Sequence, residues 1–366
     1  MPLRVVPLTE HELPATRAFN ARMLAGRAPT DFLLPENLPQ RPFPSNPTII
    51  WTHYVVVDGP EVRGGVVEMN QPAVLNGSLE RVMNYQSPLS EAILDRRYGL
   101  VSLSLIRFME RQGAGAFAVG MGWPSNPFPR ALRAAGWSVR PVPFYFRVHR
   151  ANRVLRELTL FRKTAVSSLL ADVARLTGLG ALGFKVTQFR RASQERGIVQ
   201  VSSWDTWADD LWNTFQVECS LAVSRDRKTL EDLYPSTEPR LLRFLIRRGQ
   251  KPVGWSIALL TQNGHRKYFG NLRVGSILDC VAESGEMQAT VQMTDSALAA
   301  RGADLVVSNQ SHVLWRSAFR RSGFLPGPSN FLLGMSKRLF NQVSLQPSGE
   351  DRIHLNRGDG DGRIHL

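Results

Sequence analysis

The sequence repeats one ordered pattern of glycines and apolar segments, with the second copy roughly 190 residues after the first. In each half a glycine precedes a strand-like segment, a second glycine opens a helix-like run, and a third glycine ends that run. The corresponding positions are Gly64 and Gly254, Gly99 and Gly285, and Gly113 and Gly302. A repeat of this length indicates two copies of one domain. A length of 366 residues also fits two domains of ordinary size.

The repeat predicts where the domains begin and end. We expect a first domain over residues 1–150, a helical connector over 151–198, a second domain over 199–340 and a Gly/Asp-rich tail over 341–366. Apolar residues of the connector keep helical spacing, which favours an interdomain helix packed on both domains. A basic amphipathic helix that binds a membrane surface is the alternative for this segment.

Hydrophobic periodicity predicts the same kind of elements in both halves. Asp58-Gly59 and Arg248-Gly-Gln250 are predicted turns between strands. The first half is expected to contain helices over 11–26, 99–112 and 130–135 and strands over 49–57, 62–68, 79–85, 116–119 and 142–148. The second half is expected to contain helices over 204–219, 226–234, 284–300 and 313–321 and strands over 241–247, 253–260, 268–278, 305–308 and 330–336.

Composition narrows the class of protein. The net charge is +14, from 45 basic and 31 acidic residues, but the basic residues are scattered, which disfavours a dedicated nucleic-acid binder. The charge indicates either a solvated surface or an anionic partner, such as a CoA pyrophosphate, a phospho-sugar, nucleic acid or an anionic membrane. Cys219 and Cys280 are the only cysteines, which predicts neither a disulfide framework nor a zinc site. Short apolar runs and the absence of a signal-peptide pattern predict a cytoplasmic protein without a transmembrane segment.

Three local motifs carry a family resemblance. The first is Arg96-Arg-Tyr-Gly-Leu-Val101, between a predicted strand and a predicted helix. The second is a short helix that ends in Gly and an aromatic residue, at Trp137 and at Phe324. The third is Arg225-Asp-Arg-Lys-Thr-Leu230, followed by Tyr234 and by Gly254-Trp255. In this order the motifs resemble the GNAT superfamily of acyl-CoA-dependent N-acyltransferases, in two copies over most of residues 1–340. The third motif is similar to tandem proteins related to the Fem-type aminoacyl transferases and to exopolysaccharide-cluster acyltransferase-like proteins.

The resemblance implies an α/β protein with two GNAT-like domains, each a mixed, mostly antiparallel sheet with helices on both faces. It also implies that a Gln/Arg-x-x-Gly-x-Gly/Ala loop cradles the pyrophosphate of CoA with main-chain N–H groups. Arg96 and Gly99 match that loop, whereas the β-branched Val101 departs from it. In the second copy only Gly285 is retained, and Glu283 and Glu286 would oppose an anion. The first copy is therefore expected to bind acetyl-CoA, through Arg96, Arg97, Tyr98, Gly99, Leu100, Val101 and Asn126.

The chemistry needs a base that removes a proton from the acceptor amine. In the family this base often lies on the strand that precedes the phosphate loop, where the first copy offers Glu68 and Asn84-Tyr85-Gln86. The second copy offers Asp279 and Glu283, and His312 is a further candidate. Structural alternatives are a solvent-facing Glu68, a surface or capping Asp279 and an exposed His312 at a helix N-terminus. The tyrosine that the family uses as an acid in its last helix is missing from both copies.

Three functions remain open on the sequence. The first is acyl transfer from acetyl-CoA to an amine of a small molecule or glycan, with the first copy holding CoA and the second shaping the acceptor site. The second is a Fem-like transfer from aminoacyl-tRNA, which fits the charge. The third is a catalytically degenerate tandem domain that binds a partner. The tail lacks the ligand set of a calcium loop. Its Gly/Asp turn would let the flanking Ile-His-Leu segments pair or dock on a domain.

Overall fold

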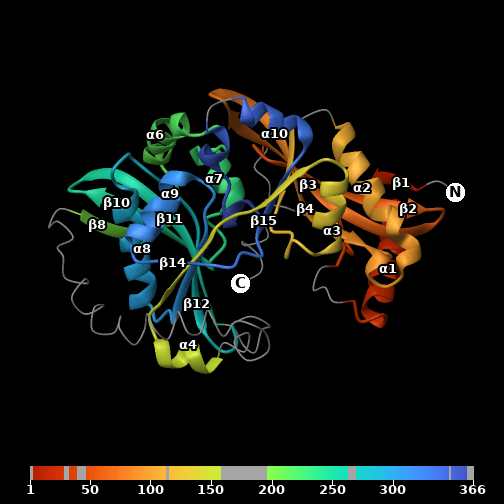
Figure 1. Ribbon diagram of the computed structural model, residues 1–366, viewed down its shortest axis with the longest axis horizontal. Helices are drawn as coiled ribbons and strands as arrows, with labels where there is room; N and C mark the ends of the chain where they lie inside the picture. Colours follow the sequence, from red (N-terminus) through yellow and green to blue (C-terminus); the bar gives the residue numbers. More distant parts are fainter. Residues whose placement is uncertain are drawn as a thin grey trace. The chain divides into compact units, whose positions relative to one another are not determined.

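The computed structural model describes residues 3–28, 33–38, 47–112, 115–157, 196–262, 269–345 and 348–360. The chain divides into two compact units, which Figure 1 displays as ribbons. The first unit contains residues 1–142, 216–233 and 329–361, and the second contains residues 143–215, 234–328 and 362–366. Each unit is built around one mixed sheet, and neither unit is a continuous stretch of chain.

The sheet of the first unit has the strand order β1-β2-β3-β4-β5-β15-β6, with β9 paired to β3 and β16 paired to β9. β4 and β5 are parallel, and so are β9 and β16, while the other neighbours are antiparallel. The predicted turn at Asp58-Gly59 joins β2 to β3, with Gly59 at φ +58°. The strands are β1 (Arg4–Pro7), β2 (Ile50–Asp58), β3 (Glu61–Leu75), β4 (Ser78–Ser90), β5 (Gly115–Val119), β6 (Ser138–Pro141), β9 (Leu221–Val223), β15 (Leu332–Met335) and β16 (Ile353–His354).

Helices cover both faces of this sheet, as predicted. α1 (Leu13–Ala25) packs Phe19 and Met23 against β2 and β3 on one face. α2 (Gly99–Arg111) and α3 (Pro127–Ala134) pack on the other face, where Leu105 and Trp137 share a core with Tyr85 of β4. We call these the α1 face and the α2 face. The first unit also contains α7 (Arg227–Leu233) and α10 (Lys337–Ser344).

The sheet of the second unit has the strand order β14-β7-β13-β12-β11-β10-β8, with β12 and β13 parallel. The strands are β7 (Phe144–Val148), β8 (Arg196–Gln200), β10 (Leu241–Arg248), β11 (Lys251–Gln262), β12 (Arg273–Ala282), β13 (Leu305–Asn309) and β14 (Leu325–Gly327). The helices of this unit are α4 (Ala151–Glu157), α6 (Thr206–Phe215), α8 (Met287–Ala300) and α9 (Val313–Arg321). Read from β8 to β14, the seven strands match β1, β2, β3, β4, β5, β15 and β6 of the first sheet position by position.

The two sheets exchange one strand each. The sequence predicts strands over 142–148 and 330–336 as the last strands of the first and second copies. Both strands form, but β7 lies between β13 and β14, and β15 lies between β5 and β6. Each strand therefore completes the sheet of the other copy. An alternation pattern predicts that a segment is a strand, but it does not specify the partner strand.

Several short elements were not predicted, namely β1, β6, β8, β9, β14, β16 and α10. The predicted strand over 268–278 begins only at Arg273, and most of the predicted helical connector lies outside the described residues. The docking expected of the tail occurs in its first half, because Ile353 and His354 pair with Leu221 and Ala222. Its second Ile-His-Leu segment lies outside the described residues.

Among the helices described, none has the length and hydropathy required to cross a bilayer. The described part of the chain likewise contains no group of three or more His, Cys, Asp and Glu residues placed to hold a metal ion. Cys219 and Cys280 are both buried free thiols.

Candidate functional site

The parallel strands β4 and β5 separate within the first sheet. They pair from Val82 and Gly115 to Asn84 and Phe117, after which β4 continues along β3 alone as far as the described pairing goes. We call the point beyond Asn84 the first-unit split. A bulge follows it, at which Ser87 takes φ +49°. Bulges of this kind redirect side chains and are frequent beside active sites.

A buried carboxylate lies at the first-unit split. Glu68 of β3 is the cross-strand partner of Tyr85, the first β4 residue beyond the last β5 pair. The Tyr85 hydroxyl donates a hydrogen bond of 3.0 Å to Glu68 Oε2, and Glu68 is only 6% exposed. The alternative of a solvent-facing Glu68 is therefore wrong. Both side chains lie on the α2 face, because Tyr85 belongs to the core under α2.

The environment of Glu68 favours its neutral form. Burial raises the pKa of Glu68, and the hydrogen bond from Tyr85 only partly opposes this effect. Burial and the nearby Glu68 charge raise the pKa of the Tyr85 hydroxyl far above its ordinary value, so this hydroxyl stays protonated and donates. A carboxylate with a raised pKa is suited to accept and return a proton near neutral pH.

This environment predicts a pH-dependent stability difference for Glu68→Gln. The pKa of Glu68 is higher in the folded state than in the unfolded state. The fold therefore loses stability as the pH rises from the unfolded-state pKa of Glu68 through its folded-state pKa. The variant should therefore unfold at higher urea concentration than wild type at pH 8, by on the order of 1 kcal/mol. At a pH below the ordinary glutamate pKa the difference should vanish. A variant that is equally destabilised at both pH values would contradict the assignment.

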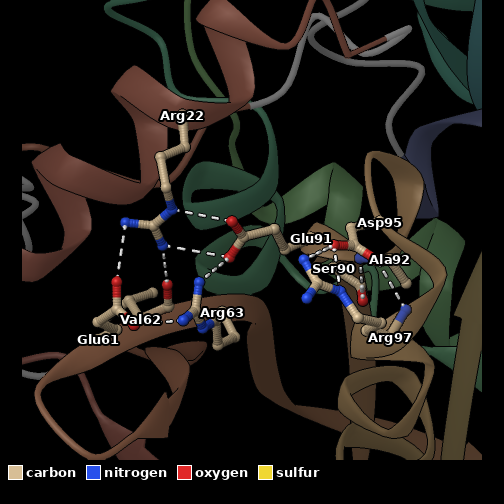
Figure 2. Close-up of polar contacts among 9 residues, drawn as sticks. All are labelled: Arg22, Glu61, Val62, Arg63, Ser90, Glu91, Ala92, Asp95 and Arg97. Atoms are coloured by element: carbon tan, nitrogen blue, oxygen red, sulfur yellow. Dashed lines mark hydrogen bonds and ion pairs between the residues drawn. The ribbon is translucent and has the colours of Figure 1, made fainter.

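The predicted phosphate loop connects β4 to α2 through two short 3-10 helices, Glu91–Ile93 and Arg96–Tyr98. The loop caps itself: Ser90 Oγ accepts a hydrogen bond from the Ala92 N–H, and Asp95 Oδ1 accepts one from the Arg97 N–H at 2.9 Å. Asp95 also holds the Arg97 side chain, with 2.7 Å from Nε to Oδ2 (Figure 2). The hydrogen bonds from Arg97 lower the pKa of Asp95. Arg97 is thus engaged inside the loop.

A buried ion-pair network fixes the beginning of this loop. Glu91 accepts hydrogen bonds from Arg22 of α1 at 2.8 Å and from Arg63 of β3 at 3.0 Å, and Figure 2 shows both arginines converging on it. Burial opposes the charge on Glu91, but the two arginines outweigh it and lower its pKa. Arg63 also lies 4.3 Å from the ring centre of Tyr98, just before α2. The network therefore joins α1, β3 and the start of α2.

The remaining predicted cofactor residues have different surroundings. Arg96 is exposed and its side chain makes no ion pair or hydrogen bond among the described residues, and Leu100 is 64% exposed. Val101 is fully buried, and a Cβ on Gly64 would lie 2.8 Å from its Cγ1. The Val101 side chain thus packs against the sheet. Asn126 is exposed at the N-terminus of α3 and makes no side-chain cap within the described structure.

The second unit has an equivalent split that its own side chains occupy. β12 and β13 pair from Val274 and Leu305 to Ile277 and Ser308. Beyond this point the buried Gln310 donates from Nε2 to Ser308 Oγ at 3.0 Å and lies 3.9 Å from Cys280 Sγ. A side-chain amide therefore bridges the two strands where their main-chain pairing ends.

The candidate base Asp279 is fully buried on β12. Asp279 Oδ2 accepts a hydrogen bond of 2.8 Å from the Tyr234 hydroxyl, and its Oδ1 accepts one from the Cys280 N–H. The alternative of a surface Asp279 is therefore wrong.

His312 is also buried. It is 1% exposed, caps α9 by accepting from the Leu314 N–H at 3.4 Å, and lies edge-on to Phe215 with ring centres 5.5 Å apart. The alternative of an exposed His312 is wrong, and the side chain has a structural role in α9.

The acidic loop before α8 is neutralised. Glu283 pairs with Lys251 at 2.6 Å, and Glu286 pairs with Arg196 at 2.8 Å and with Arg248 at 3.1 Å. The hydrogen bond from Arg196 is the main cause of the lowered pKa of Glu286. Both carboxylates are therefore paired with cations, and Glu286 occupies the N-cap position of α8. That they oppose an anion at this loop stays a prediction.

Sequence reasoning did not identify Arg22, Arg63 and Glu91 as parts of the site. One signal was present, because Arg63 stands within the apolar segment Val62-Arg-Gly-Gly-Val66. A charged residue in such a strand requires a buried partner.

Solved structures with a similar fold were found, although no similar sequence was. No protein-family description and no curated protein matches this sequence. A GCN5-related N-acetyltransferase from Anabaena variabilis is similar in structure, with a TM-score of 0.51 and 10% identity over 91% of this chain and 72% of that one. A tandem GNAT protein of the clavulanic acid pathway has a TM-score of 0.48 and 14% identity over 92% and 98%. Saccharomyces cerevisiae N-myristoyltransferase with bound myristoyl-CoA has a TM-score of 0.49 and 11% identity over 92% and 83%.

The first of these likenesses, together with the two sheets described above, gives the chain a tandem GNAT fold. At 10% sequence identity this similarity shows a shared fold and does not show a shared activity or substrate.

Proposed function

We propose that the protein is an N-acyltransferase that moves an acyl group from acyl-CoA, with acetyl-CoA as the donor, to a primary amine of a small molecule or glycan. The observation that carries the proposal is the buried Glu68–Tyr85 pair, which lies where β4 leaves β5 and on the face covered by α2. A proton acceptor, an unpaired strand edge and a helix start thus belong to one short region of the first unit. This combination supports acyl transfer on a GNAT fold.

The loop from Arg96 to Val101 would hold the donor's pyrophosphate. Arg96 is exposed and Arg97 is balanced by Asp95, so the loop carries one positive charge in excess. The Tyr98 position at the start of α2 has no side-chain cap in the described structure, which leaves the helix dipole available to an anion. The donor supplies the activated thioester, and Asn126 is proposed to contact its pantetheine arm.

Glu68 is proposed to accept the proton of the attacking amine. Its raised pKa suits that task, and Tyr85 keeps the carboxylate oriented through the 3.0 Å hydrogen bond. Beyond Asn84 the β4 main chain has no described β5 partner, so an N–H group there can donate to the thioester oxygen as negative charge develops. α3 carries Phe128 and no tyrosine, so the leaving sulfur is proposed to take its proton from solvent.

Charge reversal at Arg96 is expected to weaken acetyl-CoA binding. Loss of one charge-assisted phosphate contact and gain of a repulsive one should raise the Kd by about 10-fold or more, measured by isothermal titration. Arg107→Glu is the matched control, because Arg107 is an exposed arginine of α2, the helix that follows the loop, and lies outside its first turn. If wild type binds no acetyl-CoA, or if Arg96→Glu and Arg107→Glu bind it equally well, the first copy does not hold the donor.

The net charge of +14 favours aminoacyl-tRNA as the second candidate donor. Binding of tRNA that weakens steeply between low and high salt would support this candidate. A binding protein without catalysis is the third candidate, supported by the missing helix tyrosine and by the closed second-unit split. Lack of turnover with either donor, together with capture of a specific partner, would favour it.

A further inference from the structure

Buried polar residues also gather on the α1 face of the first sheet, opposite the Glu68–Tyr85 pair. Side chains alternate along a strand, so Asn84 and Gln86 point away from Tyr85. The amides of Asn84 and Gln86 donate to the Asp359 carbonyl at 2.7 and 3.0 Å. Asp359 Oδ1 in turn pairs with Arg225 Nη2 at 2.7 Å. These contacts hold the segment from Asn356 to Gly360 against the first-unit split.

Gln71 lies beside this group. Ala73 of β3 pairs with Val223 of β9, and the Ser224 N–H donates to the Pro72 carbonyl. Continued two residues beyond the last strand pair, this register would place Gln71 opposite Arg225. The β3–β4 pairing places Asn84 one step diagonally away from Gln71. We call Gln71, Asn84, Gln86, Arg225 and Asp359 the α1-face polar cluster. Each of its members is at least nine-tenths buried.

Three atoms of this cluster lack a hydrogen-bond partner within the described part of the chain: Gln71 Nε2, Gln71 Oε1 and Asn84 Oδ1. A buried polar atom without a partner is costly, and native proteins rarely tolerate several together. The Arg225 charge is matched by Asp359, so these three atoms call for hydrogen bonds and not for a counter-ion. A bound ligand or a buried water would supply these hydrogen bonds.

We propose that the α1-face polar cluster binds a neutral amide-like group of the acceptor substrate. Among the three atoms without a partner, Gln71 Nε2 is a donor and Gln71 Oε1 and Asn84 Oδ1 are acceptors. A primary amide of a ligand carries both an N–H donor and a carbonyl acceptor on one planar group, so it complements them. A carboxylate would leave both acceptors unsatisfied, and an ammonium group would leave Gln71 Nε2 unsatisfied. The tail from Asn356 to Gly360 is then part of the acceptor site. The inference rests on the proposed function only where it names the ligand an acceptor.

The test compares three amines that differ at one end: β-alaninamide, its isostere 3-methylbutylamine, and β-alanine. Their binding to the full-length protein is measured by titration calorimetry without any donor. We expect wild type to prefer β-alaninamide by about 10-fold over both others, and Gln71→Met to abolish that preference. Gln262→Met, at an exposed glutamine of β11, is the control and should keep the preference.

The outcomes separate this inference from the proposed function. Equal binding of the three amines, absence of binding, or an unchanged preference in Gln71→Met would overturn the inference and leave the cluster occupied by water alone. The inference can fail while acetyl-CoA still binds through Arg96. Conversely, a Gln71-dependent preference in a protein that does not bind acetyl-CoA would support this site and reject the donor assignment. Thermal unfolding of Gln71→Met shows that the variant is folded before the binding result is used.

Discussion

Replacement of Glu68 by glutamine is expected to reduce kcat/KM for acyl transfer by about 10²–10⁴-fold, the usual contribution of a general base. The acetyl-CoA Kd should not change, because Glu68 lies on β3 and not in the loop proposed to hold the donor. In wild type the acidic limb of the pH–rate profile should lie above the ordinary glutamate pKa, since burial raises the pKa of Glu68. Glu68→Gln should lose that limb.

Glu80→Gln is the matched control for this prediction. Glu80 is an exposed glutamate of β4 in the same sheet, so its replacement should leave the rate and the pH profile unchanged. Full activity in Glu68→Gln would contradict the assignment. Loss of activity in Asp279→Asn in that case would transfer the base to the second unit, where Asp279 is held by Tyr234.

Replacement of Arg225 by methionine is expected to destabilise the first unit by about 3–5 kcal/mol, the usual cost of leaving one charge of a buried pair without its partner. Arg225 and Asp359 are both inaccessible to solvent, and Nη2 and Oδ1 are 2.7 Å apart. Urea unfolding followed by circular dichroism at pH 7 measures the effect.

A double variant keeps the Arg225 prediction testable if the single variant folds poorly. Arg225→Met with Asp359→Leu removes both charges, so it should recover much of the lost stability. A change below about 1 kcal/mol in Arg225→Met would show that the pair contributes no more than a surface ion pair. The tail would then not be fixed by this contact.

Much of the fold was readable from local patterns. The segments around Val55, Leu105 and Val306 formed the predicted strand, helix and strand, because their apolar spacing matches one burial pattern. The partner of a strand was not readable. Phe144 to Val148 could satisfy its alternation in either sheet, since the two sheets offer equivalent positions. The position of the tail was not predictable either, because its contacts with Asn84 and Gln86 join residues that are far apart in the sequence.

The candidate site was only partly predictable. Glu68 was predicted because it lies on a strand before the expected phosphate loop. The burial of Glu68 was not predictable, because it depends on Tyr85 and on the helices that cover the α2 face. The charge of the loop before α8 was misjudged, because Arg196 and Arg248 reach Glu286 from other strands. The sequence shows which charges are present, whereas their compensation depends on tertiary contacts.

The exchange of β7 and β15 affects how the chain can fold during synthesis. Leu333 of β15 pairs with Val119 of β5, so this edge of β5 gains its partner strand only after Leu333 has been synthesised. Most multidomain proteins fold their N-terminal domain early, while the rest is still being translated. Until β15 has been synthesised, the edge of β5 that pairs with it has no partner strand. Such an edge can pair with other chains, so we expect a nascent chain of this protein to depend on a chaperone.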